Sequence, residues 1–166
     1  AFRQFLVVGL LSGLVTMPLV AQPSGTLVVT NKQEATASII DVASGRTVAT
    51  VPTGAGPHEV ALTADGRMAV VTDYGAQQAG STLTVIDVPA GGVARTIQLG
   101  EHRRPHGIAY LPGDSLVAVT SEASRHVVIV HPASGTIRKA IPTEHPGSHM
   151  LGFGAAADRI YTGDMQ

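Results

Sequence analysis

The chain has 166 residues, of which 44% are hydrophobic, 14% charged and 4% aromatic, and its formal net charge is -1. With eleven Lys and Arg against twelve Asp and Glu, it lacks the basic excess and the stacking aromatic residues typical of nucleic-acid-binding proteins, so we expect no nucleic-acid partner. It contains no cysteine, which excludes disulfides, thiolate metal sites, cysteine nucleophiles and a lipid-modified cysteine anchor.

An apolar segment opens the chain. Arg3 precedes the 17-residue run FLVVGLLSGLVTMPLVA at residues 5–21, and a polar, proline-containing stretch follows at 22–24. A positive charge, an apolar run and a small residue in this order are typical of a signal peptide. The alternative, an N-terminal membrane anchor, is disfavoured because a spanning helix needs about 20 apolar residues and this run also contains Gly and Pro. We therefore predict a signal peptide at 1–21, a mature chain without a membrane span, and export to the periplasm, the cell surface or the medium.

Three similar stretches follow one another along the rest of the chain. They read GPHEVALTADGRMAVVTDYG (56–75), RPHGIAYLPGDSLVAVTSEA (104–123) and GSHMLGFGAAADRIYTGDMQ (147–166). Their alignment gives one column of histidines, His58, His106 and His149, and one column of threonines, Thr72, Thr120 and Thr162. A second shared unit, exemplified by SIIDVASGRTVATV and TVIDVPAGGVARTI, aligns Asp41, Asp87 and His131. The chain is therefore built from repeats.

Each repeat contains four short runs rich in Val, Ile, Leu and Thr, separated by turn-forming sequences such as ADG, PGD, ASG and PAGG. No segment after residue 24 has the apolar spacing of a helix. A repeat of roughly 43–48 residues with four strands matches the blade of a β-propeller, whereas an Ig-like sandwich would not repeat so regularly. The sequence thus predicts an all-β fold of four-stranded antiparallel propeller blades.

The strand sequences LVVTN (27–31), AVVTDY (69–74) and VAVTSE (118–123) resemble the YVTN family of β-propeller repeats, and the resemblance extends over essentially all of residues 25–166. It implies a secreted or cell-surface propeller, commonly of seven blades. The family spans binding and surface proteins, and related propellers include lactonases and the haem d1 domains of nitrite reductases. PHGIA at 105–109 is also similar to the repeat motif of virginiamycin B lyase, of whose usual residues after the turn Glu122 alone is kept.

Residues 22–166 provide about three to three and a half blades at roughly 45 residues a blade. The repeat units span about 25–56, 57–104, 105–147 and 148–166, so that the first unit has no His-bearing strand and the last has two strands. A closed propeller typically needs four to eight blades. We therefore predict that the chain is the N-terminal portion of a longer propeller and forms an incomplete part of its ring. A half-ring that pairs with a second copy is the alternative.

Candidate functional residues lie where the first strand of each blade begins, because this strand lines the channel of a propeller. The loops EHRRPH (101–106) and EHPGSH (144–149) share the pattern Glu-His-x-x-x-His, whose imidazole and carboxylate groups suit a divalent metal or acid–base chemistry. The adjacent arginines would attract an anion to the same mouth. The predicted ligand-binding residues are His58, Glu59, His102, Arg103, Arg104, His106, His145 and His149. The candidate metal ligands are Glu101, His102, His106, Glu144, His145 and His149.

A structural role explains the same histidines equally well, because repeats copy their loop residues whether or not these act. The nucleophile-elbow pattern GxSxG and the phosphate-binding pattern GxxxxGK[ST] are absent from the sequence, which also requires no cofactor. We predict a non-catalytic module that binds a protein or a small-molecule ligand through its loops and channel mouth. The alternatives are a lactonase- or lyase-like enzyme with a His and Glu metal site, and an accessory propeller of a periplasmic haem or quinone oxidoreductase.

Overall fold

The computed structural model describes residues 23–154, 156 and 158–165, so the predicted signal peptide lies outside the described residues. Thirteen strands of the described part form four antiparallel sheets. None of the helices in this part is long and apolar enough to cross a membrane.

The sheets follow one another along the chain. The first consists of β1 (Thr26–Asn31), β2 (Thr36–Asp41) and β3 (Arg46–Pro52). The second consists of β4 (Pro57–Leu62), β5 (Met68–Gly75), β6 (Ala79–Asp87) and β7 (Gly92–Gln98). The third consists of β8 (Pro105–Tyr110), β9 (Val117–Ser121), β10 (His126–His131) and β11 (Thr136–Pro142), with one turn of 3-10 helix at Glu122–Ser124. The fourth consists of β12 (Ser148–Phe153) and β13 (Ile160–Asp164).

The last two strands of each of the first three sheets, β2–β3, β6–β7 and β10–β11, are joined by the same tight turn. In the first sheet Asp41 Oδ1 accepts a hydrogen bond from Ser44 N at 2.8 Å, and Gly45 has a φ of 66°. A carboxylate that bonds the backbone of the turn, followed by a glycine in the left-handed region, is a stable way to reverse a strand. Asp87 with Gly91, and His131 with Gly135, form the equivalent turns. The aligned sequence unit is thus the cause of the aligned hairpins.

The hydrophobic core lies between neighbouring sheets. Successive side chains of a strand point to opposite faces of the sheet, so a strand buried on both faces has a continuous apolar run. In β5, Val70 packs toward the third sheet while Ala69 and Val71 pack toward the first. The cluster between the two four-stranded sheets consists of Val70, Leu83, Val85, Ile97, Leu99, Val117, Val119, Val128 and Val130. This double burial is what stacks one sheet on the next.

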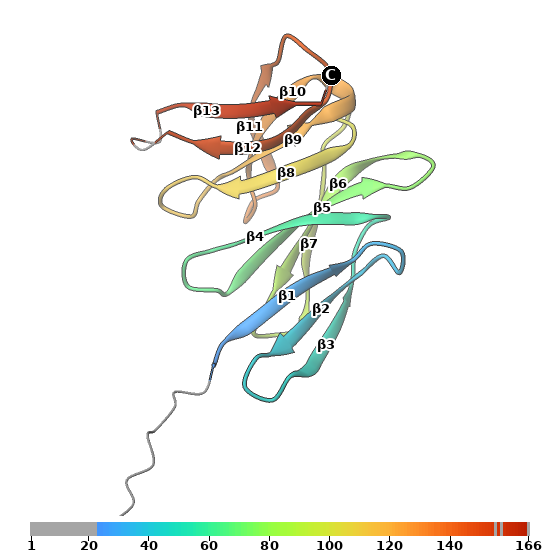
Figure 1. The fold of residues 1–166 in the computed structure, drawn as a ribbon, viewed down its shortest axis with the longest axis vertical. Helices are drawn as coiled ribbons and strands as arrows, with labels where there is room; N and C mark the ends of the chain where they lie inside the picture. The colour runs from blue at the N-terminus through green and yellow to red at the C-terminus, as the bar shows by residue number, and fades with distance from the viewer. Residues whose placement is uncertain (1–22, 155, 157, 166) are drawn as a thin grey trace, which may run out of the picture.

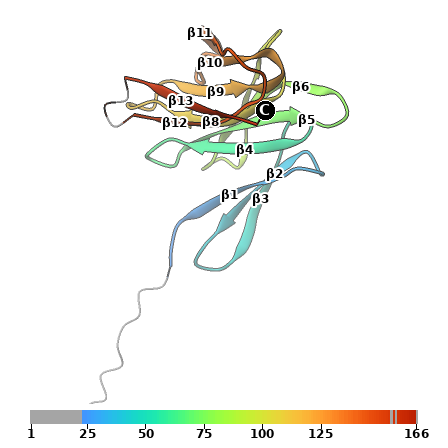
Figure 2. The same ribbon diagram turned by 45° about the horizontal axis from the view of Figure 1, so that its top comes forward.

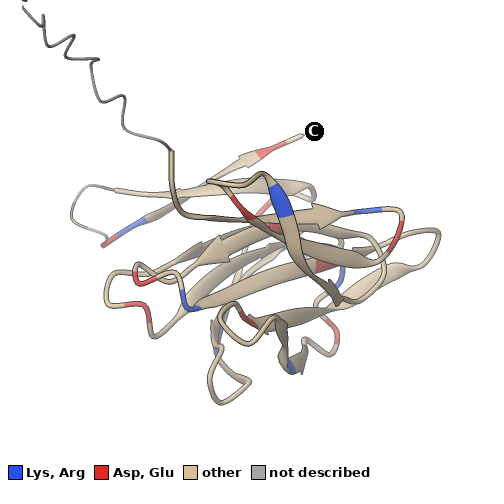
Figure 3. Ribbon diagram, turned by 90° about the horizontal axis from the view of Figure 1, so that it is seen from below, with Lys and Arg blue, Asp and Glu red and all other residues tan. Residues whose placement is uncertain are grey.

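The sheets fan out around their first strands. Figures 1 and 2 show β4, β8 and β12 side by side, and β1 next to β4. Lys and Arg segments are interspersed with Asp and Glu segments, many of them in loops (Figure 3), which leaves the sheet faces free to pack. Four successive antiparallel sheets in this arrangement confirm the predicted all-β fold, an incomplete β-propeller of between three and four blades.

Candidate functional site

Each histidine of the aligned column lies in a bulge at the start of an inner strand. A bulge places an extra residue in one strand and changes the direction of its side chain. In all three inner strands the pairing register with the second strand shifts by one residue at the same place. The shift lies between Pro57 and Val60, between Pro105 and Ile108, and between Ser148 and Leu151. The repeated bulge therefore gives His58, His106 and His149 equivalent orientations on successive blades.

The aligned threonines hold these bulges and connect neighbouring blades. Thr120 Oγ1 accepts a hydrogen bond from Gly107 N at 2.8 Å and donates one to His149 O of the next blade at 2.6 Å. In the first sheet, Thr30 Oγ1 donates to His58 O at 3.0 Å in the same way. A Cβ atom at Gly107 would lie 2.7 Å from His149 O, so glycine is what permits this close approach. Thr30 and Thr120 thus fix the positions of His58 and His149 against the preceding blade.

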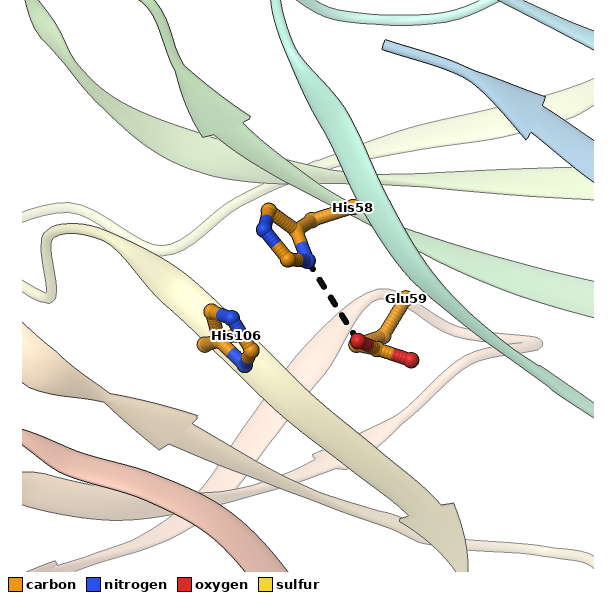
Figure 4. A group of neighbouring side chains, drawn as sticks. All are labelled: His58, Glu59 and His106. Atoms are coloured by element: carbon orange, nitrogen blue, oxygen red, sulfur yellow. Dashed lines mark hydrogen bonds and ion pairs between the residues drawn. The ribbon is translucent and has the colours of Figure 1, made fainter. Parts of the chain in front are cut away.

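The three imidazole rings form a stack across the inner strands. His106 is in the middle, with its ring centroid 4.1 Å from that of His58 and 3.8 Å from that of His149. Figure 4 shows the rings of His58 and His106 approaching each other from β4 and β8, with Glu59 beside them. Glu59 Oε1 lies 3.3 Å from His58 Nδ1. Three titratable rings from three blades therefore meet at one place.

Two side chains from the second strands and their following turns complete the cluster. The hydroxyl of Tyr74 donates a hydrogen bond to Glu122 Oε2 at 2.7 Å, and the other carboxylate oxygen of Glu122 lies 2.5 Å from His149 Nδ1. Glu122 is only 7% exposed. The ring of Tyr74 also lies 5.3 Å from that of His58 and meets that of His106 edge-on at 5.5 Å. A buried carboxylate is thus held on both oxygens, one by a phenol and one by an imidazole.

His106 is the most enclosed member of the cluster. His106 is 2% exposed, and its Nδ1 atom has no hydrogen-bond partner among the described residues. Burial, followed by the neighbouring rings of His58 and His149, lowers the pKa of His106 to about 4 despite the attraction of Glu122 and Glu59. At neutral pH the ring is therefore uncharged and keeps one nitrogen lone pair for a ligand or a proton.

A hollow of about 380 Å³ opens beside this cluster. Arg104 lies over the ring of Tyr74, with its guanidinium carbon 4.7 Å from the ring centroid. Arg125 lines the same hollow, and in the described part of the chain neither arginine forms an ion pair with a carboxylate. The full lining is Tyr74, Arg104, Glu122, Ala123, Arg125, Pro146, Gly147 and Met165. Two guanidinium groups and one carboxylate line the hollow, so its lining carries a net positive charge.

The structure gathers part of the set predicted from the sequence. The residues described form two groups of three possible metal ligands, His58 with Glu59 and His106, and His106 with Glu122 and His149. Four of the predicted metal ligands, Glu101, His102, Glu144 and His145, belong to neither group. Glu101, Arg103, Glu144 and His145 are exposed, and the buried His102 packs against His126 with ring centroids 4.9 Å apart.

A change of backbone direction separates the two histidines of each Glu-His-x-x-x-His loop. Arg104 has a φ of 57° and Gly147 has a φ of 85°, so the chain turns through the left-handed region just before each inner strand. In the first loop, His102 consequently faces the neighbouring loop while His106 faces the inner strands. The residues of the Glu-His-x-x-x-His motif therefore do not all lie in one cluster.

Sequence reasoning assigned no site role to Tyr74 and Glu122, although the repeat contained the signal. Both residues stand two positions after an aligned threonine, a column that also contains Lys32 and Asp164. Lys32 Nζ lies 5.3 Å from the centroid of the Tyr74 ring. The column is therefore placed at the same mouth as the histidines, and its residue types differ from blade to blade.

Comparison with known proteins supports the architecture. No family model and no curated protein matches the sequence. The structure is similar to a chain of hydrazine synthase from Kuenenia stuttgartiensis, a β-propeller-containing protein, with a TM-score of 0.73 and 17% sequence identity over 93% of this chain and 45% of that chain. The present chain thus spans less than half the length of that chain. At this level of identity the similarity establishes a shared propeller fold.

Proposed function

We propose that the chain forms part of an exported β-propeller of the YVTN type and acts as a binding module for a small anionic ligand, such as a carboxylate or a phosphate, at the channel mouth. The observation that carries the proposal is the hollow beside the histidine stack, which Arg104 and Arg125 line without carboxylate partners among the described residues. Guanidinium groups bind carboxylates and phosphates through paired, charge-assisted hydrogen bonds.

The surroundings of Arg104 favour a ligand over simple hydration. Arg104 is only partly exposed, and its guanidinium lies over the ring of Tyr74, which limits its conformations before a ligand arrives. Tyr74 is itself fixed by the hydrogen bond to Glu122. A site that is ordered in advance loses less entropy on binding, so one partly buried arginine in such a frame contributes more than a free surface arginine.

The experiment is a titration of the isotopically labelled full chain with inorganic phosphate and, separately, with citrate at constant ionic strength, followed by amide NMR shifts. We expect saturable shifts at Tyr74 and Glu122. Arg104→Met should weaken the affinity about tenfold or more, because it removes a hydrogen-bonded charge. The matched control is Arg46→Met, on the exposed face of β3, which should leave the affinity unchanged. Shifts that do not saturate, or an equal effect of the two substitutions, would contradict the proposal.

A further inference from the structure

The buried polar groups at the centre of the mouth have a chemistry that anion binding does not use. His106 and His149 each place a ring nitrogen, and Glu122 a carboxylate oxygen, within 4.8 Å of one another. We propose that these three side chains form a binding site for one divalent transition-metal ion such as Zn²⁺. Neither arginine of the hollow belongs to this set, so the inference goes beyond the proposed anion-binding function and does not depend on it.

The separation of the ligand atoms suits such an ion after small side-chain rotations. Zinc binds imidazole nitrogens and carboxylate oxygens at about 2.0–2.2 Å, so ligand atoms of a tetrahedral site lie roughly 3.4 Å apart. The nitrogen of His149 and the oxygen of Glu122 are already in contact at 2.5 Å. The side chain of His149 is 35% exposed and has room to rotate, whereas His106 is fixed by burial.

The unpartnered nitrogen of His106 is the independent sign of a ligand. A polar atom buried without a hydrogen-bond partner is rare in folded proteins and calls for a water, an ion or a functional role. His106 Nδ1 is such an atom among the described residues, in a residue that is 2% exposed. One ring nitrogen of His106 also lies within 4.8 Å of a carboxylate oxygen of Glu122, and imidazole nitrogens beside a carboxylate suit divalent transition metals.

The second group of three, His58 with Glu59 and His106, is the less suitable of the two. Its carboxylate belongs to a side chain that is 36% exposed and lies 3.3 Å from the nearest histidine nitrogen. The carboxylate of Glu122 is buried, and the hydroxyl of Tyr74 orients its second oxygen. Outer hydrogen bonds of this kind fix a ligand in place and raise metal affinity. The ion is therefore assigned to Glu122 rather than to Glu59.

Three protein ligands leave one position of a tetrahedral ion free. Sites of this composition hold a water molecule or an added ligand at the fourth position. Glu122 also lines the hollow that contains Arg104 and Arg125. The fourth position is thus accessible to small molecules that enter from the mouth.

The test uses the full chain without an affinity tag, purified in a chelator-free buffer that contains no phosphate or citrate. Equilibrium dialysis against ZnCl₂ with elemental analysis gives the stoichiometry and the affinity, and the absorption spectrum of the Co²⁺ form reports the coordination. We expect one equivalent of zinc per chain and a Co²⁺ spectrum typical of four-coordination. Glu122→Gln should weaken zinc binding at least about tenfold. His149→Ala, at a half-exposed position, is the second variant and should do the same.

The controls separate this site from the other candidates. Glu59→Gln removes the carboxylate of the second group, and His145→Ala removes an exposed histidine of the loop motif. Both should keep the zinc affinity of the parent chain. Circular dichroism of every variant verifies folding. The inference is wrong if the folded parent chain retains no zinc, or if Glu59→Gln or His145→Ala weakens binding as much as Glu122→Gln does. Phosphate binding with no zinc binding would contradict this inference and leave the proposed function standing.

Discussion

The space between the blades and the mouth of the inner strands are built from the same repeated sequence but differ in chemistry. Between the two four-stranded sheets, nine apolar side chains form a cluster in which every member is at most 2% exposed. At the mouth, His106 and Glu122 are buried as well, at 2% and 7% exposed, and one nitrogen of His106 has no partner among the described residues. Close packing accounts for the first region, whereas the second contains polar groups that packing alone does not require.

The aligned columns behave differently in the two regions. Val71 and Val119 stand directly before aligned threonines and are both completely buried. Two positions after the threonines, the column changes from Lys32 to Tyr74 to Glu122. The histidine column at the same mouth keeps its residue type in His58, His106 and His149. The mouth therefore combines one constant column with one that varies from blade to blade.

The largest effect should come from opening the core between the blades. Leu83→Ala removes a completely buried side chain and should lower the free energy of unfolding by about 2–5 kcal/mol, because it combines lost burial with a cavity. Urea denaturation followed by circular dichroism measures the change. Val93→Ala, at a position of β7 that is 42% exposed, is the control and should change the free energy of unfolding by no more than about 0.5 kcal/mol. Equal effects of the two substitutions would remove the distinction between core and surface.

A smaller effect is expected where the core meets the mouth. Thr120→Val keeps the shape of the side chain but removes its hydrogen bonds to Gly107 N and His149 O. The loss leaves a buried backbone group unpaired and should cost about 1–3 kcal/mol of unfolding free energy. It should also shift the NMR signals of His149. Thr96→Val, an exposed strand position of β7, is the matched control. An unchanged His149 signal would show that the threonine column does not position the histidines.

The fold was predictable from the sequence because its causes are local. Asp41 and Gly45 specify one hairpin, and the same unit recurs with Asp87 and Gly91, so turns and strands follow from short stretches of chain. Alternating burial on both faces then dictates stacking of the sheets. The histidine column was predictable for the same reason, since each repeat places its histidine at the second residue of an inner strand.

The repeat alignment marks the column of Tyr74 and Glu122, but their contact was not predictable because it forms between blades. The contact of Tyr74 with Glu122 joins residues 48 positions apart, and no spacing within one motif encodes it. The loop pattern Glu-His-x-x-x-His does not bring its own residues together in one group, and in the first loop Arg104, between the two histidines, has a left-handed conformation. His102 packs against His126 and not against the histidines of the inner strands.

The convergence of the histidines is the central claim, and the proximity of their rings tests it most directly. In the full chain with labelled histidines, nuclear Overhauser contacts between ring protons identify neighbours. The structure predicts contacts from His106 to both His58 and His149, and separate contacts between His102 and His126. A folded chain in which the ring of His106 contacts neither His58 nor His149 would contradict the account.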